Sequence, residues 1–232
     1  MKCRLFCFGS HLLVSLLVAV VSLLVVFGVW YPSPLDAGLG VASIFMLLLC
    51  IDVVIGPLLT LVVARQGKKT LKADLAVIAL LQVTALAYGL YTVAQGRPVW
   101  LVYDHNRFEV VQAYEAVTAA AAPDAPPLTF TGPQWAAVTA DPAATANRDA
   151  FLQQAFLRGY GADAGRNAQA GAHAVPLAVL QKFNDPAQVD ALLRPYPAAT
   201  GYIPMIAKEK TLVVLVNKAD GLPIAIVDLR PW

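Results

Sequence analysis

The chain has 232 residues, of which 58% are hydrophobic and only 14% are charged, and its formal net charge is +2. Soluble domains carry roughly 25% charged residues, so this composition is typical of a membrane protein. The small positive charge gives no reason to expect nucleic acid as a partner. The apolar excess lies before Gly96, and the remainder has the composition of a soluble domain.

The first long apolar run covers residues 10–30, and Lys2 and Arg4 precede it in residues 1–9. This arrangement is similar to a secretory signal peptide. However, Trp30-Tyr31-Pro32 follows the run, where small cleavage-site residues would be needed. We therefore expect a retained transmembrane helix with aromatic residues at its far end.

Two further apolar runs, residues 38–64 and 74–95, are also long enough to cross a bilayer, which takes roughly 20 residues. The segment 65–72 between them is basic, whereas the loop 31–37 contains no lysine or arginine. The positive-inside rule then predicts that residues 1–9 and 65–72 are cytoplasmic. Three crossings place everything after Gly96 on the other side of the membrane.

Asp52 stands near the middle of the second run. A charge at that depth costs at least about 2.5 kcal/mol in lipid, so we expect this carboxylate to face protein or water. It either bonds a polar side chain inside the bundle or holds a partner helix, and the two roles are compatible. The candidates for an internal bond are Gln82, Thr84, Ser15 and Ser22.

Gly56-Pro57 follows one turn later. Proline removes a backbone hydrogen bond, which predicts a kink that shapes either the bundle or a groove for another helix.

Residues 97–232 predict a small α+β domain. Strand-like apolar runs bounded by turn residues indicate the strands, and the last three predict an antiparallel meander. The expected strands are 99–103, 108–111, part of 130–139, 203–208, 211–217 and 222–229. Helices are expected at 147–158, from an apolar face, and from Asp185-Pro186 to residue 194, from an N-cap followed by proline. Residues 116–127 are expected to form a loop, and the Gly/Ala-rich residues 159–171 are expected to be mobile.

The outer domain lacks the residues of several common chemistries. The sequence has no serine after Ser43 and no cysteine after Cys50, which excludes a serine or cysteine nucleophile there. His105 and His173 have no metal-ligand spacing, and no phosphate-binding loop is present. We expect no enzyme activity, no catalytic residue, no cofactor and no metal site.

Several segments carry a family pattern. They are Arg4-x-x-x-Phe8-Gly9-x-His11, Trp30-Tyr31-Pro32-x-Pro34-Leu35, Asp52-Val53-Val54-Ile55-Gly56-Pro57-Leu58-Leu59-Thr60, Gln82-x-x-Ala85-Leu86-x-Tyr88-Gly89, Gly96-Arg97-Pro98 and Pro231-Trp232. Together they resemble the type IV pilin accessory protein family, of the TfpX/TfpZ type. The likeness is dense over about the first 115 residues and returns in the C-terminal strands.

This resemblance implies a bacterial inner-membrane protein with a periplasmic C-terminal domain that helps a cognate major pilin to be assembled or displayed. The expected partners are that pilin, the lipid bilayer and other membrane proteins of pilus assembly. We expect the bundle to dock the apolar helix of the pilin and the outer domain to contact its head. The candidate partner-binding residues are Asp52, Gly56, Pro57, Thr60, Gln82 and Tyr88.

Two other classes remain open at this point. A membrane-anchored sensor would bind a ligand with the outer domain, but it would normally continue into a cytoplasmic output domain. An integral-membrane transferase that modifies the pilin would call for acidic or histidine residues on the outer loops, and the loop 31–37 supplies only Asp36.

Overall fold

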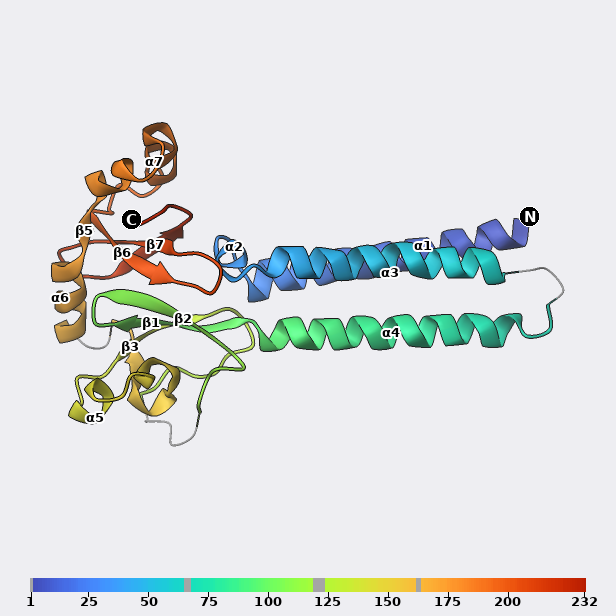
Figure 1. Cartoon of the computed structure of the whole chain (residues 1–232), viewed down its shortest axis with the longest axis horizontal. Coiled ribbons are helices and arrows are strands. Elements are labelled where there is room, and N and C mark those ends of the chain that lie inside the picture. Colours follow the sequence, from blue (N-terminus) through green and yellow to red (C-terminus); the bar gives the residue numbers. More distant parts are fainter. Residues whose placement is uncertain (1, 65–67, 119–123, 162–163) are drawn as a thin grey trace. The chain divides into compact units, whose positions relative to one another are not determined.

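The computed structural model describes residues 2–64, 68–118, 124–161 and 164–232, with the side chains of residues 2 and 3 left out (Figure 1). Part of the basic segment predicted to be cytoplasmic, residues 65–67, therefore lies outside the described residues. The chain divides into two compact units. The helical unit comprises Met1–Val29 and Val41–Gln95, and the sheet unit comprises Trp30–Gly40 and Gly96–Trp232.

Three long helices form the helical unit in the described residues: α1 (Lys2–Val25), α3 (Val41–Val63) and α4 (Leu71–Gln95). Each is long and apolar enough to cross a membrane, so the predicted three apolar helices are confirmed as helices. The first begins at Lys2, earlier than expected, and a π-helical turn, Val26–Trp30, continues it. Helix α3 packs against both α1 and α4.

Two glycines let α3 and α4 approach closely. A Cβ atom on Gly56 would lie 1.8 Å from Nε2 of Gln82, and one on Gly89 would lie 2.3 Å from Cδ2 of Leu48. Small residues at such contacts are how membrane helices gain packing area without a hydrophobic driving force between them.

The segment Trp30–Gly40, of which residues 31–37 were expected to form only a short loop between two helices, is part of the sheet unit. It contains the short helix α2 (Leu35–Leu39), which ends at Gly40 with a positive φ of 67°. Leu35 is only 1% exposed and packs in the core of the sheet unit, and the backbone N–H of Glu209 donates to the carbonyl of Gly38 at 2.9 Å. An apolar side chain and a backbone carbonyl thus anchor the connection between α1 and α3.

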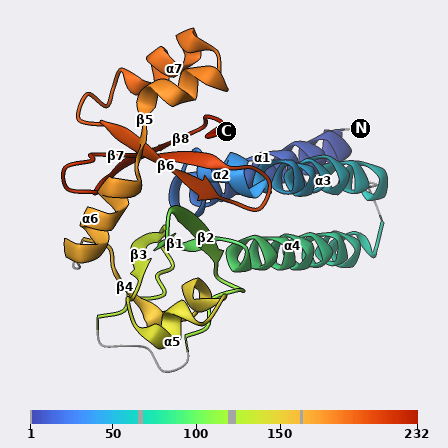
Figure 2. The same cartoon turned by 60° about the vertical axis from the view of Figure 1, so that its left-hand side comes forward.

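The sheet unit is built on one sheet, which has eight strands in the described residues (Figure 2). Seven strands follow the order β4-β3-β1-β2-β6-β7-β8, and β5 pairs with β6. Their bounds are β1 (Pro98–Asp104), β2 (Arg107–Gln112), β3 (Gln134–Val138), β4 (Leu157–Gly159), β5 (Val175–Pro176), β6 (Gly201–Ile206), β7 (Leu212–Val216) and β8 (Pro223–Val227).

The sheet is mixed rather than purely antiparallel. The last three strands form the predicted antiparallel succession, and β1 and β2 form the predicted hairpin. However, β1 pairs with β3 in parallel, and β2 pairs with β6 in parallel. The meander therefore describes one end of the sheet only.

Successive residues of a strand point to opposite faces of the sheet. Other elements of the sheet unit cover both faces. Leu101 and Tyr103 of β1 pack on one face with Leu35 and with Ala170 of α6 (Ala164–His173). Trp100 and Val102 pack on the other face with Ala144 of α5 (Pro142–Thr145). Residues of α7 (Pro186–Leu193) cover that second face beside β7.

Of the two helices predicted in the sheet unit, one was wrong and one is confirmed. Residues 147–158 form short 3₁₀ turns and β4, because the backbone of Gln154 turns away to donate to the carbonyl of Val117 at 2.9 Å. The Gly/Ala-rich segment 159–171, where no helix was predicted, contains most of α6. The predicted cap of α7 is confirmed, since the Asp185 carboxylate accepts from the N–H groups of Ala187 and Gln188.

Candidate functional site

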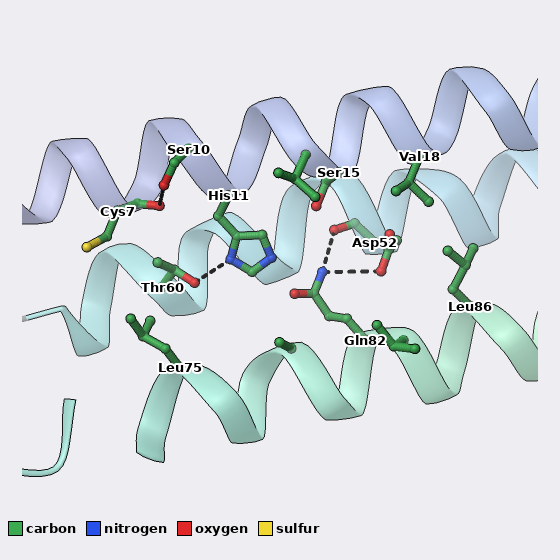
Figure 3. A pocket seen from close by; sticks show the side chains of 13 residues that line it. Cys7, Ser10, His11, Ser15, Val18, Asp52, Thr60, Leu75, Gln82 and Leu86 are labelled. Atoms are coloured by element: carbon green, nitrogen blue, oxygen red, sulfur yellow. Dashed lines mark hydrogen bonds between the residues drawn. The ribbon is translucent and has the colours of Figure 1, made fainter. Parts of the chain in front are cut away.

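A groove of about 380 Å³ runs along the helical unit between α1, α3 and α4 (Figure 3). Most of its wall is apolar, with polar side chains on all three helices. Its lining residues are Cys7, Ser10, His11, Val14, Ser15, Val18, Asp52, Thr60, Leu75, Ala79, Gln82, Val83 and Leu86. Along α1 and along α4 it extends for about three turns, roughly 16 Å at 1.5 Å per residue.

Polar contacts join α1 to α3 at one end of the groove. Nδ1 of His11 lies 2.6 Å from Oγ1 of Thr60, which is itself 1% exposed. Nε and a terminal nitrogen of Arg4 both donate to the carbonyl of Leu61, at 3.0 and 2.8 Å. That carbonyl lies in the last turn of α3, where carbonyls lack helical donors and the helix dipole favours a cation.

A second polar contact joins α3 to α4 in the middle of the groove. Nε2 of Gln82 donates to Oδ1 of Asp52 at 3.2 Å and to the backbone carbonyl of Asp52 at 3.0 Å (Figure 3). Of the four internal partners considered for Asp52, the structure selects Gln82. Oε1 of Gln82 is buried and accepts no hydrogen bond from the described residues.

The structure gathers most of the candidate residues but not all of them. Asp52, Thr60 and Gln82 line the groove, while Gly56 and Gln82 also line a smaller, mostly apolar cavity of about 200 Å³ between α3 and α4. Pro57 is buried inside α3. Tyr88 is 73% exposed, and in the described structure it lines neither cavity.

Sequence reasoning missed the part that α1 plays in this site. Cys7, His11 and Ser15 recur at intervals of four, which places them on one face of a helix. This spacing could have predicted that all three line the groove. Gly56 leaves room for the Gln82 amide because it has no side chain. The sequence near Gly56 does not predict this contact, because the contact depends on the register of α3 against α4.

In the sheet unit, aromatic and basic residues fix the segment that enters from α1. The ring of Trp30 meets Phe130 edge to face at 5.2 Å between centroids, and the Arg97 guanidinium lies 5.0 Å from the Phe130 centroid. Burial raises the pKa of the Tyr31 phenol, partly offset by the nearby Arg97 charge. This cluster has the character of a structural anchor.

The titratable residues of the described chain offer no metal centre. Among the described residues, no three His, Cys, Asp or Glu side chains are gathered so that they could hold a metal ion. In the sheet unit, burial raises the pKa of Tyr103 to about 12, and its hydroxyl donates to the backbone carbonyl of His105 at 2.5 Å.

Comparison with known proteins identifies the family. Residues 1–40 match the model described as fimbrial assembly protein FimB. A fimbrial assembly protein of serogroups C1 and C2 from Dichelobacter nodosus is 34% identical over 105 residues, which make up 44% of this chain and 80% of that relative. The chain belongs to the FimB family of fimbrial assembly proteins. The family resemblance drawn from its membrane motifs is thereby confirmed.

Two further fimbrial assembly proteins from Dichelobacter nodosus are matched over a smaller share of their own length. The fimbrial assembly proteins of serogroup I and serogroup E1 are 36% and 33% identical over 105 residues, 44% of this chain. The match spans 41% of each of them, less than half of their length. No solved structure matches the chain.

Proposed function

We propose that this FimB-family chain is a non-enzymatic accessory protein of the inner membrane that assists the assembly or surface display of a type IV major pilin. The groove of the helical unit docks the apolar transmembrane helix of the pilin. The sheet unit lies in the periplasm and contacts the pilin head. The observation that carries this proposal is the groove itself, a site with polar side chains along helices of membrane-spanning length.

The orientation follows from the basic residues at one end of the helical unit. Arg4 lies in the first turn of α1 and bonds near the end of α3, and Lys68, Lys69 and Lys72 follow α3 in the chain. Lysine and arginine favour the cytoplasmic side. The opposite ends of the helices lead into the sheet unit, which this orientation places in the periplasm.

A transmembrane helix suits the groove because the polar groups of the groove lack hydrogen-bond partners when lipid surrounds them. Hydrocarbon offers no hydrogen bonds, so the carboxylate of Asp52 and the buried Oε1 of Gln82 remain poorly satisfied when lipid fills the groove. A helix that lies against α1 and α4 covers about three turns of wall and brings polar groups of its own. The relatives are fimbrial assembly proteins, and the pilin subunit is the component of a fimbrium that carries such a helix.

Filling the groove is expected to abolish pilin binding. We expect Ala79→Trp to reduce the pilin recovered with tagged full-length protein by at least about tenfold, because an indole at this wall keeps a partner helix from approaching. The measurement is co-purification from membranes in mild detergent, with the pilin quantified by mass spectrometry.

Val77→Trp is the matched control on the same helix, because Val77 is 56% exposed and in the described structure lines neither cavity. It should leave pilin recovery unchanged. Equal recovery with both variants, at equal protein level, would show that the pilin does not dock in this groove. Intact mass of pilin from cells with and without the protein should be the same, as expected for an accessory role without covalent modification.

A further inference from the structure

The middle of the groove has more acceptors than donors. Asp52 contributes two carboxylate oxygens, of which only Oδ1 receives a hydrogen bond from the described residues. Gln82 contributes Oε1, which is buried and accepts none from them. Nε2 of Gln82, which donates to Oδ1, is already divided between that oxygen and the backbone carbonyl of Asp52.

The basic side chains described along the groove are engaged elsewhere. His11 bonds Thr60, and Arg4 bonds the carbonyl of Leu61. A carboxylate at this depth is costly unless a counter-charge or several donors compensate it, so intramembrane carboxylates are normally paired. The described residues supply Asp52 with a single neutral donor.

We propose that the docked helix carries a cationic nitrogen that binds between Asp52 and Gln82. The ammonium or guanidinium group donates to Oδ2 of Asp52 and to Oε1 of Gln82, so that one group neutralises the charge and satisfies both acceptors. This deepens the proposed function and rests on it, because it names the chemistry by which the groove selects its occupant. A hydroxyl-bearing helix, or a lipid with an amine headgroup, is the competing occupant.

The geometry supports a helix as the source of this cation. Asp52 and Gln82 lie well inside the groove, with apolar wall on either side of them along α4, at Leu75 and at Leu86. A lipid amine belongs at the membrane surface, whereas a basic group on a docked helix reaches this depth at little cost once it is paired with a carboxylate.

The test uses three variants of Asp52 that separate charge from shape. Asp52→Asn keeps an oxygen that accepts from Gln82 but removes the charge, Asp52→Glu keeps the charge, and Asp52→Leu removes both. Each is made in full-length protein with a diazirine-bearing photo-crosslinking amino acid of about the size of leucine at Leu86, which lines the groove, and with the same crosslinker at Val77 as the background control. The readout is the yield of crosslinked pilin in intact cells and the identity of the crosslinked peptide.

We expect Asp52→Asn and Asp52→Leu to lower the yield by about tenfold or more, because a hydrogen bond to a charged group is worth more than a neutral one. Asp52→Glu should retain most of the crosslinking yield, and the crosslinked helix should carry an ammonium or guanidinium group. Unchanged capture by Asp52→Asn would overturn the cation while leaving pilin docking intact.

Absence of capture by the unaltered groove would remove the proposed function as well. Capture of lipid alone, or of a helix that carries no basic group, would also contradict the proposal. Protein level and the circular dichroism of each variant in detergent separate lost binding from lost folding.

Discussion

Leu35→Ala is expected to destabilise the sheet unit by about 2–5 kcal/mol, although Leu35 lies in the connection between two membrane helices. The side chain is 1% exposed and packs in the same cluster as Leu101, Phe108 and Leu212, so its removal leaves a cavity in the core. All four tryptophans of the chain lie in the sheet unit. Tryptophan fluorescence during denaturant unfolding of the full-length protein in detergent therefore reports this unit.

Leu222→Ala is the matched control, because Leu222 belongs to the same unit but is 40% exposed. We expect it to change the free energy of unfolding by less than about 1 kcal/mol. If Leu35→Ala unfolds at the denaturant concentration of the unaltered protein, the connection Trp30–Gly40 is not part of the core of the sheet unit.

Gly56→Leu is expected to separate α3 from α4 and to destabilise the helical unit by about 2–4 kcal/mol. A Cβ at position 56 would lie within 2.3 Å of Nε2, Cδ and Oε1 of Gln82, so the amide must leave and both of its bonds to Asp52 break. The measurement is thermal unfolding followed by circular dichroism at 222 nm, because tryptophan fluorescence does not report this unit.

Val54→Leu, at a position that is 51% exposed, provides the control and should unfold as the unaltered protein does.

A second pair of variants tests whether the clash with Gln82 causes the destabilisation. Gly56→Ala should be destabilising by itself, and the double variant Gly56→Ala/Gln82→Ala should restore part of the loss of packing, since the side chain that clashes is gone. No difference between Gly56→Leu and Val54→Leu would refute the close contact of the two helices.

Much of the architecture could be predicted because its signals are local. Long apolar runs identified the three long helices, and short apolar runs between turn residues identified β1, β2 and the last three strands. The cap of α7 was evident because Asp185 and Pro186 carry it without help from the rest of the fold.

The wrong predictions concern segments whose structure is decided by distant residues. The apolar face of residues 147–158 indicates a helix, yet pairing with Val117 takes the backbone of Gln154 out of it. The helix α6 is stabilised by contacts that no local pattern shows, because Gly171 lies against the carbonyl of Lys218, where a Cβ would be 2.4 Å away. Leu35 likewise belongs to a core assembled from residues more than sixty positions later.

The candidate site was predictable in its centre only. Asp52 was recognisable as a candidate because it is an acidic residue in the middle of a long apolar run. Gln82 was one of four side chains that could form an internal hydrogen bond with it. The sequence does not fix the rotation of α4 about its axis, so it could not tell that Gln82 rather than Thr84 meets Asp52. Tyr88 is 73% exposed and in the described structure lines neither cavity, so its part in partner binding stays a prediction.

The proposed function requires three membrane crossings that leave the groove in the bilayer and the sheet unit in the periplasm. Reporter fusions to full-length protein test this most directly, with alkaline phosphatase or a fluorescent protein placed after Trp232 or inserted at Lys69. We predict active phosphatase and no fluorescence at Trp232, and the reverse at Lys69, because the basic end of the helices stays in the cytoplasm. Fluorescence without phosphatase activity at Trp232 would contradict the account, since the sheet unit would then lie on the side opposite the pilin head.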